Sequence, residues 1–177
     1  MKVEIKKGTM KNLDELERLY NELNDALSEG TNYPGWIKGI YPIRENALKG
    51  IEDGNLFIAE CNGKIVGSII LSHEPEDGYE KVLWDIEAEC NEIIVIRTFV
   101  VHPDYFKQKV GFSVMKFAEE EAERCNMKAI RLDVYENNID VLQTADSHMT
   151  IWCLVHSKDA INAINILHKA FSVGDNE

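Results

Sequence analysis

Apolar residues recur every three or four positions over two long stretches of the chain, and this spacing is typical of amphipathic helices. The first stretch runs from Leu13 to Leu27, and the second covers Gly111–Cys125. Asn126 follows the second stretch, where it suits the left-handed residue that ends many helices. A shorter helix is predicted over Arg44–Asp53. The pattern therefore predicts three helices before residue 127.

β-type runs separate these helices. They predict strands over Val3–Lys7, Leu56–Glu60, Lys64–Ser72, Ile93–Val101 and Ala129–Val134, with a further short one over Val82–Ile86. Asn62-Gly63, between two of the runs, predicts a tight hairpin because both turn positions need a positive φ. A strand, a helix and another strand close this order, which predicts two parallel strands. The fold class is therefore α/β, with a mixed sheet and helices on both faces.

Length and charge narrow the classes of function. At 177 residues the chain suits one domain, 1–177, and its net charge of −12 disfavours nucleic-acid binding. The acidic surface either attracts a cationic amine or only keeps the protein soluble. No apolar run is long enough to span a membrane, and the N-terminus resembles a strand, so we expect a cytoplasmic protein. Four scattered cysteines without C-x-x-C spacing predict reduced thiols and no metal site.

The stretch from Arg97 to Gly111 carries the clearest chemical signal. An apolar strand stops at His102-Pro103, a short polar loop follows, and a glycine opens the long helix. A loop that feeds a helix N-terminus presents unpaired backbone N–H groups, which bind phosphate oxygens well. The stretch predicts a nucleotide-type cofactor held by the main chain, with coenzyme A as the leading candidate.

Several segments resemble the GNAT superfamily of acyl-CoA-dependent N-acyltransferases. They are Phe57–Ser68, Phe99–Tyr105 with Gly111, Met115–Ala122 and Ile130–Asn138. The resemblance covers residues 3–138 and implies a mostly antiparallel central sheet flanked by helices. It also implies acetyl-CoA as co-substrate and transfer of its acetyl group to a primary amine of a small molecule or peptide. The loop Asn32–Pro42 is similar to a bacterial GNAT subgroup whose substrate is unassigned.

The resemblance also implies which residues contact the cofactor. The set is Phe99, Val100, Val101, Lys107, Gln108, Lys109, Val110, Gly111, Phe112 and Asn138. The family loop reads Gln/Arg-x-x-Gly-x-Gly/Ala, and an ungapped alignment leaves only Gly111 matching, with Lys109 at the first glycine. A shift of two residues, starting the motif at Gln108, fits better but moves the helix register.

For catalysis we select Glu74 and Thr98 by position, with Glu60, His73 and His102 as further possibilities. The alternative interpretation of each carboxylate is a solvated surface group. Residues expected to line the acceptor pocket are Tyr33, Trp36, Tyr41 and Arg97. The three aromatic residues equally suit a hydrophobic lid without a role in substrate binding.

Residues 139–177 depart from the family pattern. Ala145 occupies the position of a tyrosine that often acts as the general acid in the family. Met149–Val155 predicts an atypical strand, which would allow pairing across a homodimer, and residues 160–171 predict a helix. The missing tyrosine and the altered loop leave a second hypothesis open. It is a catalytically weak or inactive GNAT-like protein that binds acyl-CoA or serves as an interaction module.

Overall fold

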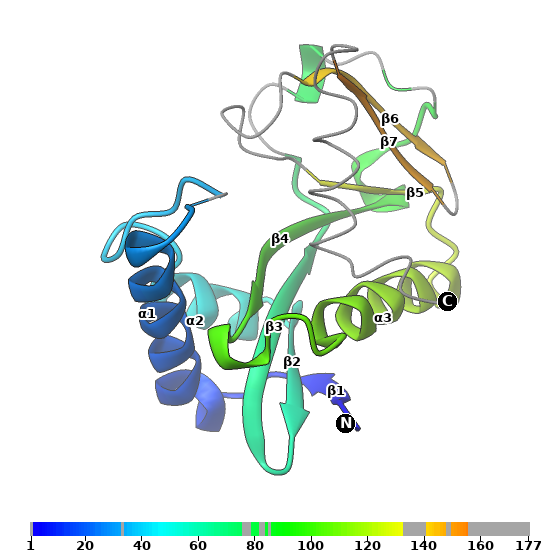
Figure 1. Cartoon of the computed structure of the whole chain (residues 1–177). Coiled ribbons are helices and arrows are strands. Elements are labelled where there is room, and N and C mark those ends of the chain that lie inside the picture. Colours follow the sequence, from blue (N-terminus) through cyan, green and yellow to red (C-terminus); the bar gives the residue numbers. More distant parts are fainter. Residues whose placement is uncertain are drawn as a thin grey trace, which may run out of the picture.

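The computed structural model describes residues 2–32, 34–75, 79–81, 84, 86–132, 141–147 and 150–155. Its centre is a five-stranded sheet in the order β1-β2-β3-β4-β5 (Figure 1). The strands are β1 (Glu4–Lys7), β2 (Leu56–Cys61), β3 (Lys64–Ser72), β4 (Ile93–Val101) and β5 (Ala129–Arg131). The first four are antiparallel, and β5 is parallel to β4. The predicted crossover from one strand to a parallel neighbour is confirmed.

Helices cover both faces of this sheet, as predicted (Figure 1). They are α1 (Leu13–Glu29), α2 (Arg44–Glu52) and α3 (Val110–Arg124), and short 3-10 turns occupy Met10–Asn12, Tyr79–Lys81, Cys90–Glu92 and Pro103–Tyr105. The leucine stripe of α1, with Ala47 of α2, packs on one face against Ile58 and Ile70. On the other face, Val114 and Ala118 of α3 pack against the opposite side chains of the same strands. The two faces thus hold separate apolar clusters.

Two local signals in the sequence act as predicted. Asn62 and Gly63 have φ values of 52° and 76°, and they form the turn between β2 and β3. Asn126 has a φ of 55° and follows α3. Left-handed backbone of this kind favours Gly and Asn, so the sequence marks these positions clearly.

A β-bulge interrupts the pairing of β3 with β4, and no local sequence signal predicted it. Ser68 lies opposite Val100 and Ile70 lies opposite Arg97, so two residues of β4, Thr98 and Phe99, share the space opposite one residue of β3. Such a bulge bends the strand and re-aims its side chains.

Further along the chain, β6 (Val141–Ser147) and β7 (Thr150–Val155) form a separate two-stranded antiparallel sheet. The predicted strand in the tail is seen over Thr150–Val155, whereas β6 was not predicted. The expected helix over 160–171 lies outside the described residues, and so does most of the expected strand Val82–Ile86.

Candidate functional site

The edge of β4 that faces away from β3 is open over most of its length in the described part of the chain. β5 pairs only with Ile93, Ile94 and Val95 of this nine-residue strand. At the far end, the N–H of His102 donates to the carbonyl of Val66 on β3 at 2.9 Å. Because neighbouring residues in a strand direct their backbone groups to opposite sides, those of Val101 face the open edge. This edge offers main-chain groups to an extended ligand.

The loop after β4 keeps a glycine-like conformation without glycine. Lys107 and Lys109 have φ values of 59° and 62°, and Lys109 is the residue that precedes α3. A left-handed backbone costs a residue with a Cβ about 1–2 kcal/mol. Gln108 helps to hold the turn, because its Nε2 donates to the Asp104 carbonyl at 2.7 Å. In the ungapped alignment Lys109 stands at the first glycine of the family loop, and it adopts a left-handed backbone that glycine favours.

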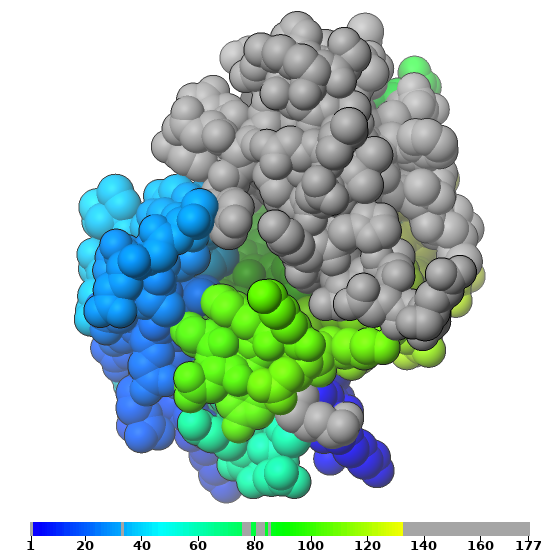
Figure 2. All heavy atoms as spheres, viewed as in Figure 1, coloured from blue at the N-terminus to red at the C-terminus, as the bar shows by residue number. Residues whose placement is uncertain are grey.

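The N-terminus of α3 completes this part of the site. The N–H of Ser113 donates to the Lys109 carbonyl at 3.0 Å, so the amides of Val110, Gly111 and Phe112 precede the helix's own hydrogen-bond ladder. Amides in this position, together with two lysine side chains, suit a phosphate group. Figure 2 shows α1 (blue) and the start of α3 (yellow-green) reaching the same face of the molecule.

His102 joins the end of β4 to α1. Its ring is buried, Nε2 lies 2.7 Å from Oε2 of Glu22, and Nδ1 accepts a hydrogen bond from the N–H of Asp104 at 3.1 Å. Because Nδ1 accepts, Nε2 is the nitrogen that donates to the carboxylate. Both ring nitrogens thus have hydrogen-bond partners. We interpret His102 as a residue that holds the loop against α1, rather than as a general base.

Thr98 and Tyr41 meet at the bulge. The hydroxyl oxygens of Thr98 and Tyr41 are 2.7 Å apart, although 57 residues separate them in the sequence. Thr98 is 5% exposed and has a φ of 45°, which is rare for a β-branched residue. Strain of this kind costs about 1–3 kcal/mol and tends to occur at functional positions. The structure therefore brings together a predicted catalytic residue and a predicted acceptor-pocket residue.

Side chains of α1 and the loop itself hold Tyr41 in place. Asn24 is 2% exposed, and its Nδ2 donates to the Tyr41 carbonyl at 3.4 Å. Lys38 forms an ion pair with Asp25 at 2.6 Å, and the ring of Trp36 packs edge-on against that of Tyr41, with centroids 5.4 Å apart. These contacts hold the described part of the loop between α1 and α2 where it approaches β4.

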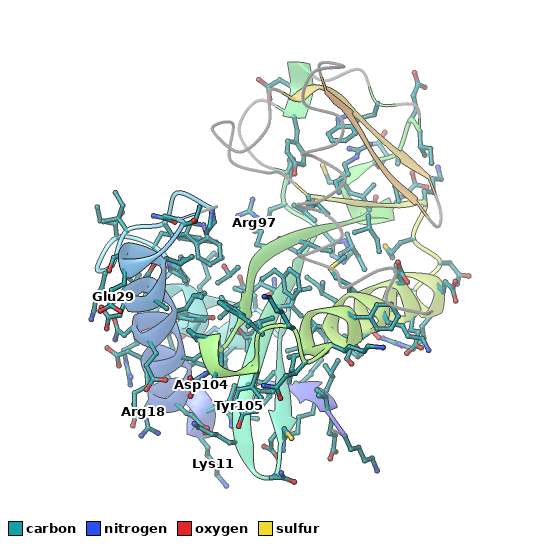
Figure 3. All side chains as sticks on the ribbon, viewed as in Figure 1. Lys11, Arg18, Glu29, Arg97, Asp104 and Tyr105 are labelled. Atoms are coloured by element: carbon teal, nitrogen blue, oxygen red, sulfur yellow. The ribbon has the colours of Figure 1, made fainter. Side chains whose placement is uncertain are left out.

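Arg97 and Glu74, two other predicted site residues, are also neighbours. Nη2 of Arg97 donates to the backbone carbonyls of Glu74 and Pro75, each at 3.2 Å. The Glu74 side chain is exposed, and Glu60 forms an ion pair with Lys6 at 2.8 Å. Figure 3 shows Arg97 on β4, well away from Asp104 and Tyr105, which lie beyond the other end of the open edge.

A second hydroxyl pair lies deeper on the same face of the sheet. Ser68 Oγ donates to the phenol oxygen of Tyr20 at 3.4 Å, and both residues are fully buried. Burial raises the pKa of Tyr20 well above its usual range, and the hydrogen bond from Ser68 offsets only part of this effect. Tyr20 therefore stays protonated at all physiological pH values.

Two predicted site residues, Tyr33 and Asn138, lie outside the described residues. Within the part that the structure describes, acidic, histidine and cysteine side chains nowhere gather in a group of three that would hold a metal ion. Nor does any helix in that part have both the length and the apolar character needed to cross a membrane.

Comparisons with known proteins support this description of the fold. A sequence model of the acetyltransferase (GNAT) family matches residues 16–146. A GNAT-family acetyltransferase from Streptococcus agalactiae 2603 superposes with a TM-score of 0.61 at 16% identity, over 77% of this chain and 78% of that one. The structure of yncA from Salmonella typhimurium, determined with its cofactor acetyl-CoA, gives a TM-score of 0.51 at 15% identity, over 73% and 68% of the two chains.

The tail matches a second family model. A sequence model of the ACT domain matches residues 134–169, which overlaps the end of the first match. Aspartokinase 1 of Bacillus subtilis strain 168 is 53% identical to this chain over 38 residues, or 22% of this chain. The chain spans only 9% of the length of that aspartokinase. The segment set apart by its departure from the GNAT pattern thus carries a second family's sequence pattern.

Proposed function

Because the chain belongs to the acetyltransferase (GNAT) family, we propose that it transfers the acetyl group of acetyl-CoA to a primary amine of a small molecule or peptide. The observation that carries this proposal is the open edge of β4, which leads directly into the loop before α3. One ligand that is extended at one end and carries phosphates at the other fits this arrangement.

The pantetheine arm of acetyl-CoA would pair with the open edge as an added strand, using backbone groups of Phe99 and Val101. The pyrophosphate would lie at the N-terminus of α3, next to Lys107 and Lys109. Lys107 and Lys109 hold the left-handed backbone that glycine favours, and their Cβ atoms occupy space that a glycine would leave to the pyrophosphate. The charge of the two lysines adds attraction to the phosphates.

The chemistry is direct transfer. The neutral amine attacks the thioester carbon, a C–N bond forms, the C–S bond breaks, the nitrogen loses a proton and the sulfur gains one. A backbone N–H of the stretch Phe99–Val101 would donate to the thioester carbonyl oxygen and stabilise the negative charge that develops there. The net charge of −12 favours an acceptor that is cationic in solution.

Two measurements test the proposal. Isothermal titration with acetyl-CoA and with desulfo-CoA measures binding, and a thiol-release assay with a panel of primary amines measures turnover. We expect both binding and amine-dependent release of CoA. Binding without turnover for any amine would reject the enzyme and favour the second hypothesis, an acyl-CoA-binding protein, which the replacement of loop glycine by lysine also suits. Absence of binding would reject the enzyme and the acyl-CoA-binding protein, and would favour the interaction module.

A further inference from the structure

A series of hydrogen bonds links α1 to the loop that precedes α3. It begins at Glu22 on α1, whose Oε2 lies 2.7 Å from Nε2 of His102. Nδ1 of the same ring accepts from the N–H of Asp104 at 3.1 Å, and the His102 carbonyl accepts from the N–H of Tyr105 at 2.9 Å. Figure 1 shows the turn Pro103–Tyr105 next to α1. The imidazole therefore fixes the start of the loop relative to α1.

The same series continues from this turn to the helix. The Asp104 carbonyl accepts from Nε2 of Gln108 at 2.7 Å, and the Tyr105 carbonyl accepts from the N–H of Gln108 at 3.3 Å. Lys109 follows directly, and its carbonyl accepts from the N–H of Ser113 at 3.0 Å in the first turn of α3. The position of the α3 N-terminus relative to β4 thus depends on contacts that begin on α1.

We propose that Glu22 and His102 are positioning residues for the cofactor, which together hold the loop 103–109 in the conformation that receives the phosphates of acetyl-CoA. This inference rests on the proposed function, and it concerns affinity rather than the chemistry at the thioester. Lys107 and Lys109 keep a left-handed backbone that is unfavourable for residues with a Cβ. A loop of this kind relaxes when its contacts are removed, and a ligand must then order it again, which lowers affinity.

The ring of His102 suits this role because it is buried and has one possible orientation. Since Nδ1 accepts from the main chain, Nε2 carries the hydrogen that Glu22 accepts, and a turned ring would lose both bonds. The ring of Tyr105 packs edge-on against it, with centroids 5.5 Å apart. The Glu22 side chain is 56% exposed, so its replacement removes the hydrogen bond without opening the core.

The test measures the affinity for acetyl-CoA and for S-acetylpantetheine, which keeps the arm and lacks the phosphates. Calorimetry gives the first, and competition with acetyl-CoA gives the second. In Glu22→Ala we expect the affinity for acetyl-CoA to fall about tenfold and that for S-acetylpantetheine to stay within twofold, since the loop serves the phosphates. Glu22→Gln should restore the affinity for acetyl-CoA, because its amide oxygen accepts the same hydrogen bond.

His102→Asn separates the two bonds of the ring. An asparagine side chain before the turn still accepts from the N–H of Asp104, as in a helix cap, but it is too short to reach Glu22. We expect the same loss of acetyl-CoA affinity as in Glu22→Ala. The double variant should be no worse than the weaker single variant, because both changes break one contact. Additive losses would show that the two residues act separately, and they would overturn the inference.

Glu17→Ala is the matched control. Glu17 also lies on α1, its side chain is 43% exposed, and it pairs with Arg44 of α2 at 2.6 Å rather than with the loop. Both affinities should stay within twofold of the wild type in this variant.

The outcomes distinguish the inference from the function on which it rests. If the wild type binds acetyl-CoA and Glu22→Ala does so within twofold, or weakens both ligands equally, the inference is wrong while the proposed function stands. If the wild type binds no acetyl-CoA, both fail. If His102→Asn does not fold, the two Glu22 variants decide, since equal acetyl-CoA affinities in Glu22→Ala and Glu22→Gln would also overturn the inference.

Discussion

The two halves of β4 resemble each other in sequence and differ in their neighbours. Ile93–Val95 is paired with β5, and Val95 also pairs with β3, whereas Ile96–Val101 has β3 as its strand partner among the described residues and an open edge on the other side. Both halves are rich in β-branched residues. In the paired half, Ile93 and Val95 pack into a buried cluster with Ala129. The open half carries the bulge and the strained Thr98.

The comparison separates stability from binding within one strand. Backbone groups on the edge that β5 covers cannot receive a ligand there, so this part of the strand serves the core. Those of the open half keep a capacity for hydrogen bonds that a ligand can use. The point at which β5 stops pairing therefore decides where the site begins.

The largest effect that we expect is on stability, from the paired half. Ile93→Ala removes a side chain that is 1% exposed, and it should lower the free energy of unfolding by about 2–5 kcal/mol. Urea denaturation measures this loss. Acetyl-CoA affinity of the folded variant, from titration calorimetry, should stay within twofold of the wild type. A parallel loss of affinity would show that the two halves are not independent.

Gly67→Ala should affect the open half instead. A Cβ at Gly67 would stand 2.8 Å from the carbonyl oxygen of Val100, so β3 and β4 must separate at the bulge. We expect about 1–3 kcal/mol of destabilisation. The shifted edge should also lower acetyl-CoA affinity, measured by calorimetry, by about tenfold. Ser68→Ala is the control next to it, since it adds no atoms. Unchanged acetyl-CoA affinity in Gly67→Ala would show that the bulge is not part of the binding site.

In the loop beyond the open half, two variants of Lys109 distinguish the effect of its backbone conformation from the effect of its charge. Lys109→Gly relieves a left-handed residue and should raise the free energy of unfolding by about 1 kcal/mol. Lys109→Gln keeps the Cβ and should leave the free energy of unfolding unchanged. Both variants should bind acetyl-CoA with a weaker dependence on salt than the wild type, because each lacks one positive charge. Titrations at low and high salt measure this, and an unaltered salt dependence would place Lys109 away from the phosphates.

The smallest effect that we expect is on the pH dependence of stability, and it arises in the paired half. The side chain of Lys128, before β5, donates to Glu92, before β4, at 2.7 Å. This bond, helped by the N–H of Glu89, lowers the pKa of Glu92 below its ordinary 4.5. A lowered pKa gives stability that is present above pH 4.5 and is lost as the pH falls through the lower value. Urea midpoints between pH 6 and pH 3 should therefore fall slightly less steeply in Glu92→Gln, with open-edge binding unaffected. An equal slope would mean that the pair contributes nothing.

Local signals made most of the fold predictable. The helical stripes, the Asn62-Gly63 turn and the β-branched run of β4 each depend on residues close together in the sequence, and all were confirmed. The family resemblance predicted that the cofactor contacts the end of β4 and the loop after it, and this stays a prediction. The left-handed lysines were not predicted, since Lys has no preference for that backbone and only its position relative to the family's glycine gives a hint.

The contact that defines the proposed acceptor side was beyond the sequence. Tyr41 and Thr98 were chosen separately, one from an aromatic loop and one from within a strand, and nothing local joins residues so far apart. The bulge that turns Thr98 toward Tyr41 lacks the glycine that often marks one. In the tail, β6 was not predicted because the chain there departs from the GNAT pattern, and the resemblance to that family implies no strand at this position.

The imidazole that connects Glu22 with the end of β4 has a consequence for recombining this protein with its relatives. Exchange of the first helix alone would pair a foreign side chain with His102, and exchange of the segment after β4 alone would do the same to Glu22. The first hybrid would leave the buried ring nitrogen without its carboxylate, and the second would leave the carboxylate without the ring. Residues 22 and 102 therefore form one inherited unit, and a successful chimera must take both from the same parent.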